Sequence, residues 1–138
     1  MSRPRLSILA WVALGSALGA GARYGLGELL GAYPAPGFPW TTFTANATGS
    51  LAIGLIAALS APEGRLALSP ALRQFLMSGV CGGFTTFSMF SAETIAAAQG
   101  GRAGLALIVV AVSVPTWLLG VWAGYALGER LSGGPGLR

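Results

Sequence analysis

The sequence predicts an all-α integral membrane protein with four transmembrane helices, of which the third is broken near Gly82–Thr85. Two observations lead to this fold class. Hydrophobic residues make up 54% of the 138 residues and charged residues only 9%, whereas charged residues form about a quarter of a soluble domain. Four apolar stretches, each near the ~20 residues that cross a bilayer, follow one another. They cover residues 7–30, 42–60, 72–98 and 104–127, and we expect residues 1–138 to form a single four-helix domain.

The composition removes most of the material that an enzyme would need. The chain has no His, Asp or Lys, and its single cysteine, Cys81, allows neither an internal disulfide nor a cysteine metal cluster. Its four Glu residues are scattered, without a paired-carboxylate pattern. The basic residues, all Arg, lie mostly near the termini and between the spans, where they set membrane topology. We therefore predict neither an enzyme nor a nucleic-acid partner.

The first span combines small residues with one deep charge. Arg23 lies towards its far end, and an Arg at that depth is costly unless it reaches the interface, pairs or faces water. Two interpretations stay open: an Arg that reaches the headgroups, or a positive charge in an aqueous vestibule that concentrates anions. Small residues four apart let helix backbones approach closely; the pairs are Gly15 and Gly19, Gly21 and Gly25, and Gly27 and Gly31.

The second span carries a polar stripe. Thr42, Asn46 and Ser50 share one helical face. An unpaired amide in hydrocarbon costs several kcal/mol, so Asn46 needs a partner. Either the amide makes a hydrogen bond to another helix, or it donates to a passing anion. The helical periodicity does not distinguish these two interpretations.

The third span is the most unusual, because residues 79–91 hold three Gly, two Thr and two Ser. Adjacent glycines at 82 and 83 each disfavour helix by ~1 kcal/mol relative to Ala. In lipid a broken helix is tolerated only where its backbone is buried in protein or lines a wet cavity. Such breaks offer bare carbonyls to cations and helix N-termini to anions. We therefore expect the break to be functional.

Beyond the break, two rows at helical spacing run side by side. One is aromatic, with Phe84, Phe87 and Phe90, and one is hydroxylic, with Thr85, Ser88, Ser91 and Thr94. If the backbone unwinds through Thr86, the pairs Phe87/Phe90 and Ser88/Ser91 remain. The alternative is that the rings pack against another helix and the hydroxyls bond back to the preceding turn.

The fourth span has Ser113, Pro115 and Thr116 near its middle. Pro115 frees the carbonyl of Ala111. Ser113 and Thr116 either extend a polar track or satisfy this kink, and we expect the second. Just before the third span, Ser69 is the predicted N-cap with Pro70 at the first helical position.

The arginines predict an orientation with both termini inside. The side of the termini holds Arg3, Arg5, Arg65, Arg73, Arg130 and Arg138, and the other side holds Arg102 and Arg23. Four short helices are few for enclosing a pore, so we expect a homo-oligomer.

Residues 82–93 (GGFTTFSMFSAE), with residues 21–24 (GARY), residues 46–49 (NATG) and the Gly-rich fourth span, resemble the Fluc/CrcB family of small bacterial fluoride ion channels. The resemblance covers essentially the whole chain. It implies a fluoride-selective channel of the bacterial inner membrane that lets fluoride leave the cytoplasm down its electrochemical gradient and lowers fluoride toxicity. It also implies an antiparallel, dual-topology homodimer in the lipid bilayer, with two pores.

The same resemblance implies roles for individual residues. The backbone carbonyls of Gly82 and Thr85 from both subunits would hold a structural sodium ion on the two-fold axis, and Arg23 would line the vestibule. The fluoride pore would contain Asn46, Phe87, Phe90, Ser88 and Ser91, with Ser113 and Thr44 as further members.

Two features depart from the family pattern. Met89 stands where the family usually has Thr, which removes one hydroxyl from the track. The bias of six Arg to two is steep for a chain that inserts both ways. Either the bias is overridden, or an oppositely oriented partner subunit is needed; we expect the homodimer.

Two other functions compete with the channel. A four-helix, dual-topology, proton-coupled exporter of small molecules would need a carboxylate deep in the membrane, and Glu28 and Glu93 both lie towards span ends. Loss of proton coupling in Glu93→Gln would favour this exporter. A non-transporting assembly subunit would explain the Gly faces but not the Phe and hydroxyl rows.

Overall fold

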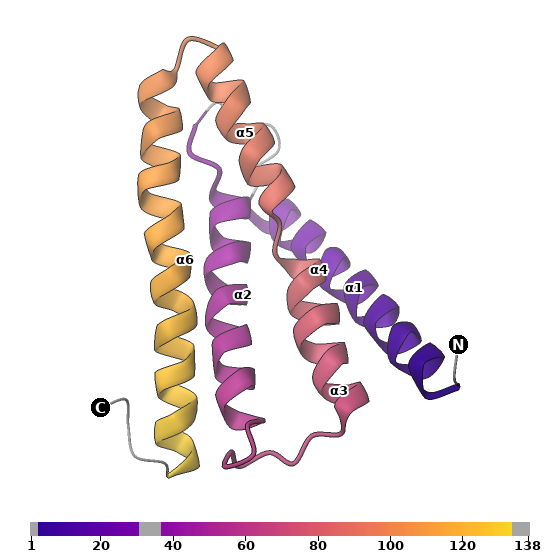
Figure 1. Cartoon of the computed structure of the whole chain (residues 1–138). Helices are drawn as coiled ribbons and strands as arrows, with labels where there is room; N and C mark the ends of the chain where they lie inside the picture. The colour runs from indigo at the N-terminus through magenta and orange to yellow at the C-terminus, as the bar shows by residue number, and fades with distance from the viewer. Residues whose placement is uncertain (1–2, 31–36, 134–138) are drawn as a thin grey trace.

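The computed structural model describes residues 3–30 and 37–133, which form helices and short connections (Figure 1). The elements are α1 (Arg3–Leu30), α2 (Trp40–Leu59), α3 (Pro70–Gln74), the π-helical segment η1 (Phe75–Cys81), α4 (Gly82–Phe84), α5 (Phe87–Gln99) and α6 (Ala103–Ser132). Because α3, η1, α4 and α5 follow one another as one bent segment, the four predicted helices are present and the third is broken. The predicted all-helical fold, with four long segments of which the third is bent, is confirmed.

Three of the four long segments are long and apolar enough to cross a membrane. They are α2, the bent segment Pro70–Gln99 and α6. Helix α1 has 28 residues, which is also long enough, but Arg23, Glu28 and its many glycines make it less apolar. That α1 crosses the membrane therefore stays a prediction.

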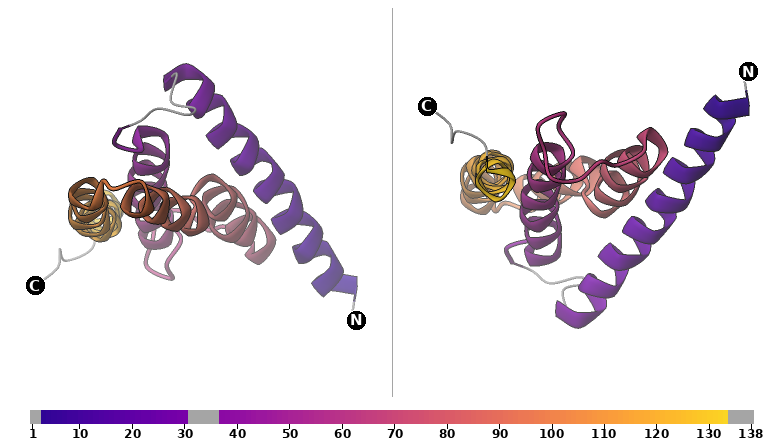
Figure 2. Two further views of the ribbon diagram at one scale, coloured as in Figure 1. Left: turned by 90° about the horizontal axis from the view of Figure 1, so that it is seen from above. Right: turned by 90° about the horizontal axis from the view of Figure 1, so that it is seen from below.

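The helices pack as two pairs. Helices α2 and α6 lie side by side and run in the same direction, because Gly120 faces Ala47 while Gly128 faces Ala58 (Figure 1). Helix α1 crosses the half formed by α3, η1 and α4, at the opposite side of the molecule from α6 (Figure 2). The broken segment thus lies between α1 and the α2–α6 pair.

Predicted small-residue contacts form where α1 crosses the broken segment. A Cβ on Gly15 would lie 2.9 Å from the Cα of Gly79, and a Cβ on Gly83 would lie 2.7 Å from the Cα of Ser16. Of the predicted pairs, Gly15 and Gly19 are therefore used within the chain. Gly21 and Gly25 face open space in the single chain, and Gly31 lies outside the described residues.

The break itself falls at Thr85 and Thr86, at the end of the predicted range. Both residues are extended, with φ −79° and ψ 160° at Thr85 and φ −154° and ψ 123° at Thr86. The two glycines expected to cause the break, Gly82 and Gly83, are helical. Gly83 serves close packing against Ser16 instead. At the start of the segment, the predicted cap is confirmed: Ser69 Oγ accepts from the Leu72 N–H and Pro70 is the first helical residue.

Candidate functional site at the helix break

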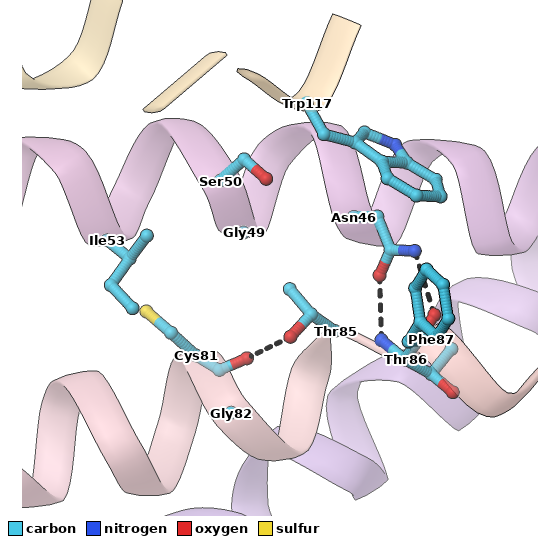
Figure 3. Close-up of a pocket in the computed structure, with 10 residues that line it drawn as sticks. All are labelled: Asn46, Gly49, Ser50, Ile53, Cys81, Gly82, Thr85, Thr86, Phe87 and Trp117. Carbon is cyan, nitrogen blue, oxygen red and sulfur yellow. Dashed lines mark hydrogen bonds between the residues drawn. The ribbon is translucent and has the colours of Figure 1, made fainter. Parts of the chain in front are cut away.

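A cavity of about 240 Å³, open on one side, lies at the break. Its walls come from three parts of the chain (Figure 3). The lining residues are Asn46, Gly49, Ser50 and Ile53 of α2, Cys81, Gly82, Thr85 and Thr86 around the break, Phe87 of α5, and Trp117 of α6. Two of the predicted pore residues, Asn46 and Phe87, and both predicted sodium ligands are thus brought together.

Asn46 holds the break in place with a two-way amide contact. Its Nδ2 donates to the Thr86 carbonyl at 2.9 Å, and its Oδ1 accepts from the Thr86 N–H at 2.7 Å (Figure 3). The side chain is only 5% exposed. Of the two interpretations of Asn46, the interhelical bond is therefore present. Since an amide has two N–H donors, one Nδ2 hydrogen remains beside the cavity.

The same contact frees backbone carbonyls. The Thr85 N–H and Oγ1 both donate to the Cys81 carbonyl, at 3.0 and 2.9 Å. Because the Thr86 N–H bonds to Asn46, it does not reach the carbonyl of Gly82 four residues earlier. Within residues 37–133, the Gly82 and Thr85 carbonyls accept no hydrogen bond. Bare carbonyls at the C-terminal end of a half-helix suit a sodium ion, so these residues fit the ion that the resemblance implies.

Helix α5 begins with its own cap. The Thr86 Oγ1 accepts from the Met89 N–H at 3.2 Å and lies 3.2 Å from the Ser88 Oγ. The N-terminal end of α5, which is the positive end of the helix dipole, therefore starts at the cavity.

An aromatic chain connects α5 to α6. The Phe87 and Phe90 rings lie 5.5 Å apart between centroids, and Phe90 meets the Trp117 ring edge-on at 4.8 Å and 76°. Phe87 is 71% exposed, whereas Phe90 is only 6% exposed. Sequence reasoning missed Trp117, although its spacing of four from Ser113 places both on one face of α6.

Part of the hydroxyl row bonds back to the preceding turn of its own helix, which was the alternative to a polar track. Ser91 and Thr94 donate to carbonyls of their own helix, Phe87 at 2.9 Å and Phe90 at 2.7 Å. In α6, Thr116 donates to the Val112 carbonyl at 2.7 Å, not to the Ala111 carbonyl that Pro115 frees.

Ser113 and Thr44 lie away from the lining of this cavity. Ser113 is only 1% exposed, and its Oγ has no partner in the part of the chain that the structure describes. Thr44 is half-buried on α2, and its carbonyl accepts from the Thr48 Oγ1.

Two charged residues are partly buried: Glu93 in the middle of α5, and Arg23 in the C-terminal third of α1. Glu93 accepts from the Thr42 Oγ1 at 3.0 Å. Arg23 on α1 is half-buried, and its Nε is buried without a partner among the described residues. Arg23 does not line the cavity at the break, so the structure of one chain does not join it to Asn46 and Phe87.

A model of one protein family, described as "CrcB-like protein, Camphor Resistance (CrcB)", matches residues 10–125. The chain belongs to the CrcB family. It is 48% identical to a relative from Bradyrhizobium diazoefficiens, over 89% of this chain and 85% of the relative. It is 45% identical to one from Rhodopseudomonas palustris, over 94% and 92%. It is 51% identical to one from Thermus thermophilus, over 88% and 95%. All three are named fluoride-specific ion channels.

The match confirms the family resemblance expected from the sequence. The CrcB match spans all four helical segments, from α1 to most of α6. As a member of a family of membrane channels, the chain is a multi-pass membrane protein and not an enzyme.

Proposed function

We propose that this chain is a fluoride-selective ion channel of the bacterial inner membrane, through which fluoride leaves the cytoplasm and loses its toxicity to the cell. The observation that carries the proposal is the identity of 45–51% to relatives that are named fluoride-specific ion channels, over 88–94% of this chain. The cavity at the helix break supports this proposal, because neutral hydrogen-bond donors and an exposed aromatic ring lie together in its lining.

The pore residues are those that the resemblance implies: Asn46, Phe87, Phe90, Ser88, Ser91, Ser113 and Thr44. Fluoride is small and tightly hydrated, so its path must replace water with good donors. The amide and the hydroxyls can donate, that of Ser91 once it leaves the Phe87 carbonyl, and the Phe ring edges carry the positive end of the aromatic quadrupole. None of these groups holds a fixed charge that would bind the ion too tightly for it to leave. Arg23 at the vestibule would raise the local anion concentration.

The driving force comes from the membrane. Hydrogen fluoride enters cells as a neutral acid and dissociates inside. A negative-inside potential then favours exit of the anion by ~2.3 kcal/mol per 100 mV. A passive pore is therefore sufficient for export.

We further propose that the working unit is an antiparallel homodimer with a structural sodium ion between the two breaks. The carbonyls of Gly82 and Thr85 would bind the ion, as their lack of hydrogen-bond partners allows. The exposed Phe87 and the open faces of Gly21 and Gly25 support a second copy. Sodium would brace the break and add positive potential near the pore.

The dimer is tested by the mass of the purified protein in detergent, with sodium or with a large organic cation as the only cation. We expect twice the chain mass in sodium and a weaker dimer without it. A monomer that conducts fluoride would overturn this part of the proposal and leave the channel function standing.

The function is tested by fluoride efflux from liposomes that hold the purified protein in sodium, beside Phe87→Ile and with chloride as the control ion. We expect fast, fluoride-selective efflux that Phe87→Ile abolishes. Leu118→Ile, also at an exposed site (67%) but on α6 away from the cavity, should conduct normally.

A pH gradient across the same liposomes separates the channel from the proton-coupled exporter. Channel efflux follows the fluoride gradient and the voltage, and it continues when the pH gradient is collapsed. Efflux that stops with the pH gradient, or no efflux from folded protein, would contradict the proposed function.

A further inference from the structure

One buried hydrogen-bond donor beside the cavity has no acceptor. The Nε1 of Trp117 is buried and has no partner in the described residues 3–30 and 37–133. The indole N–H only donates, and a buried donor without a partner is unfavourable. The side chain lines the cavity together with Asn46 and Phe87 (Figure 3). An acceptor for this N–H is therefore missing among the described residues.

The indole ring is held firmly in this position. Phe90, itself only 6% exposed, meets it edge-on at 4.8 Å. One turn further along α6, a Cβ on Gly120 would lie 3.3 Å from the carbonyl of Ala47, so α6 lies close against α2 here. The Phe90 contact and the close packing of α6 against α2 therefore restrict the indole ring.

The cavity has two kinds of lining: the carbonyls of Gly82 and Thr85, unpartnered within residues 37–133, which suit a cation, and the donors of Trp117 and Asn46, which suit an anion. No carboxylate or arginine lines this cavity among the described residues. Its other free donors include the second Nδ2 hydrogen of Asn46, whose first hydrogen is used on Thr86, and the hydroxyl of Ser50. The indole N–H can donate but cannot accept, whereas a hydroxyl in the same place could rotate to do either. An indole N–H is therefore a better partner for an anion than a hydroxyl side chain would be.

We propose that the Trp117 indole N–H donates a hydrogen bond to the permeating fluoride beside Asn46, and that Trp117 is a specificity-determining residue of the pore. This inference rests on the proposed function of the chain as a fluoride channel. The indole ring, held against Phe90, forms one wall of the cavity, and its N–H favours fluoride, which accepts a stronger hydrogen bond than chloride does.

The first test compares fluoride and chloride efflux from liposomes for the wild-type chain and two variants. Trp117→Phe removes the N–H and shortens the ring. Replacement of Trp117 by benzothienylalanine puts sulfur in the place of the N–H and keeps the shape. We expect fluoride efflux to slow about tenfold or more in both, as for the loss of a hydrogen bond to a charged group. The control Trp122→Phe, on the same helix but 61% exposed and outside the cavity, should match wild type.

The second test follows the indole N–H directly. In ¹⁵N-tryptophan-labelled protein in lipid discs, the Trp117 indole resonance, assigned with Trp117→Phe, should move on titration with fluoride and stay still with chloride. The Trp122 resonance should not move. A structural role alone would not produce this ion-specific shift.

The outcomes separate the two proposals. Suppose that the wild type conducts, that the benzothienylalanine variant conducts equally fast, and that the resonance does not move. The indole N–H then donates to water or to nothing, and the inference about Trp117 is wrong. If wild type passes no fluoride, the proposed function is wrong, and the resonance alone decides whether Trp117 binds the ion.

Discussion

The two halves of the broken third segment are built on different principles. Before the break, η1 and α4 meet α1 backbone to backbone, with Gly79 against Gly15 and Gly83 against Ser16. After the break, α5 meets its neighbours through side chains, Glu93 with Thr42 of α2 and Phe90 with Trp117 of α6. Among the described residues α5 makes no helix contact with α1.

This difference assigns different consequences to substitutions in each half. Backbone contacts leave no room for an added atom, so the first half is a fixed support. Side-chain contacts leave polar groups and the exposed ring of Phe87 available to an ion. We therefore expect changes before the break to act on folding, and changes after it to act on transport.

The largest effect is expected from Gly83→Ala. The new Cβ would lie 2.7 Å from the Cα of Ser16, and backbone atoms cannot move aside as a side chain can. Overpacking usually costs 1–3 kcal/mol, and we expect the upper end, more than about 2 kcal/mol, because the contact is with backbone. Thermal or SDS-induced unfolding of the purified protein measures the loss.

The matched control is Gly104→Ala, near the start of α6. A Cβ there meets nothing within 4 Å, and Ala favours helix over Gly by up to ~1 kcal/mol. Gly104→Ala should leave stability unchanged or slightly raised. Equal stability of Gly83→Ala and Gly104→Ala would show that the first half is not a fixed support.

The comparison also shows what the sequence can predict about the fold. Apolar length predicts the helices within a few residues, and the Ser69–Pro70 pair predicts a helix start. The Gly82–Gly83 pair predicts a break in the right region for the wrong reason. Helix propensity does not reveal that Gly83 is needed for contact with Ser16, because this contact depends on a helix more than 60 positions away. The π-helical turn η1 has no comparable sequence signal.

The candidate site was predictable to a lesser extent. The polar stripe on α2 and the desolvation cost of an amide predict that Asn46 has a partner. They do not predict that the partner is the Thr86 backbone, since that bond exists only once the segment unwinds. Trp117 was missed because an aromatic residue in an apolar span usually faces lipid or packs against another helix. Only the packing of α6 against α2 brings it to the cavity.

The second prediction concerns the amide that joins the two halves. Asn46→Leu would leave the Thr86 N–H and carbonyl without their partner, and each unpaired buried group costs ~1–3 kcal/mol. Because both bonds are only partly buried, we expect the lower end for the two groups together, a fall of about 2 kcal/mol in the free energy of unfolding, and faster hydrogen exchange at the Thr86 amide. Hydrogen exchange measured at Thr86 separates this structural effect from any effect on the ion.

Thr48→Val is the control for this change. Thr48 lies on the same helix, is exposed, and its hydroxyl bonds only within α2, to the Thr44 carbonyl. Its substitution should change stability by less than ~0.5 kcal/mol. Unchanged exchange at Thr86 in Asn46→Leu would mean that the break keeps its shape without the amide.

The smallest effect distinguishes the two threonines at the break itself. The Thr86 Oγ1 caps α5 by accepting from the Met89 N–H, so Thr86→Val should cost ~1 kcal/mol, as for the loss of an N-cap. The Thr85 Oγ1 donates to the Cys81 carbonyl, which the Thr85 N–H already satisfies. Thr85→Val should therefore cost less than ~0.5 kcal/mol. Unfolding midpoints of the two variants measure the difference, and Thr86→Ser should restore most of the cap. If Thr85→Val is the more harmful change, the start of α5 is not what stabilises the second half, and the Thr85 hydroxyl has a partner outside the single chain.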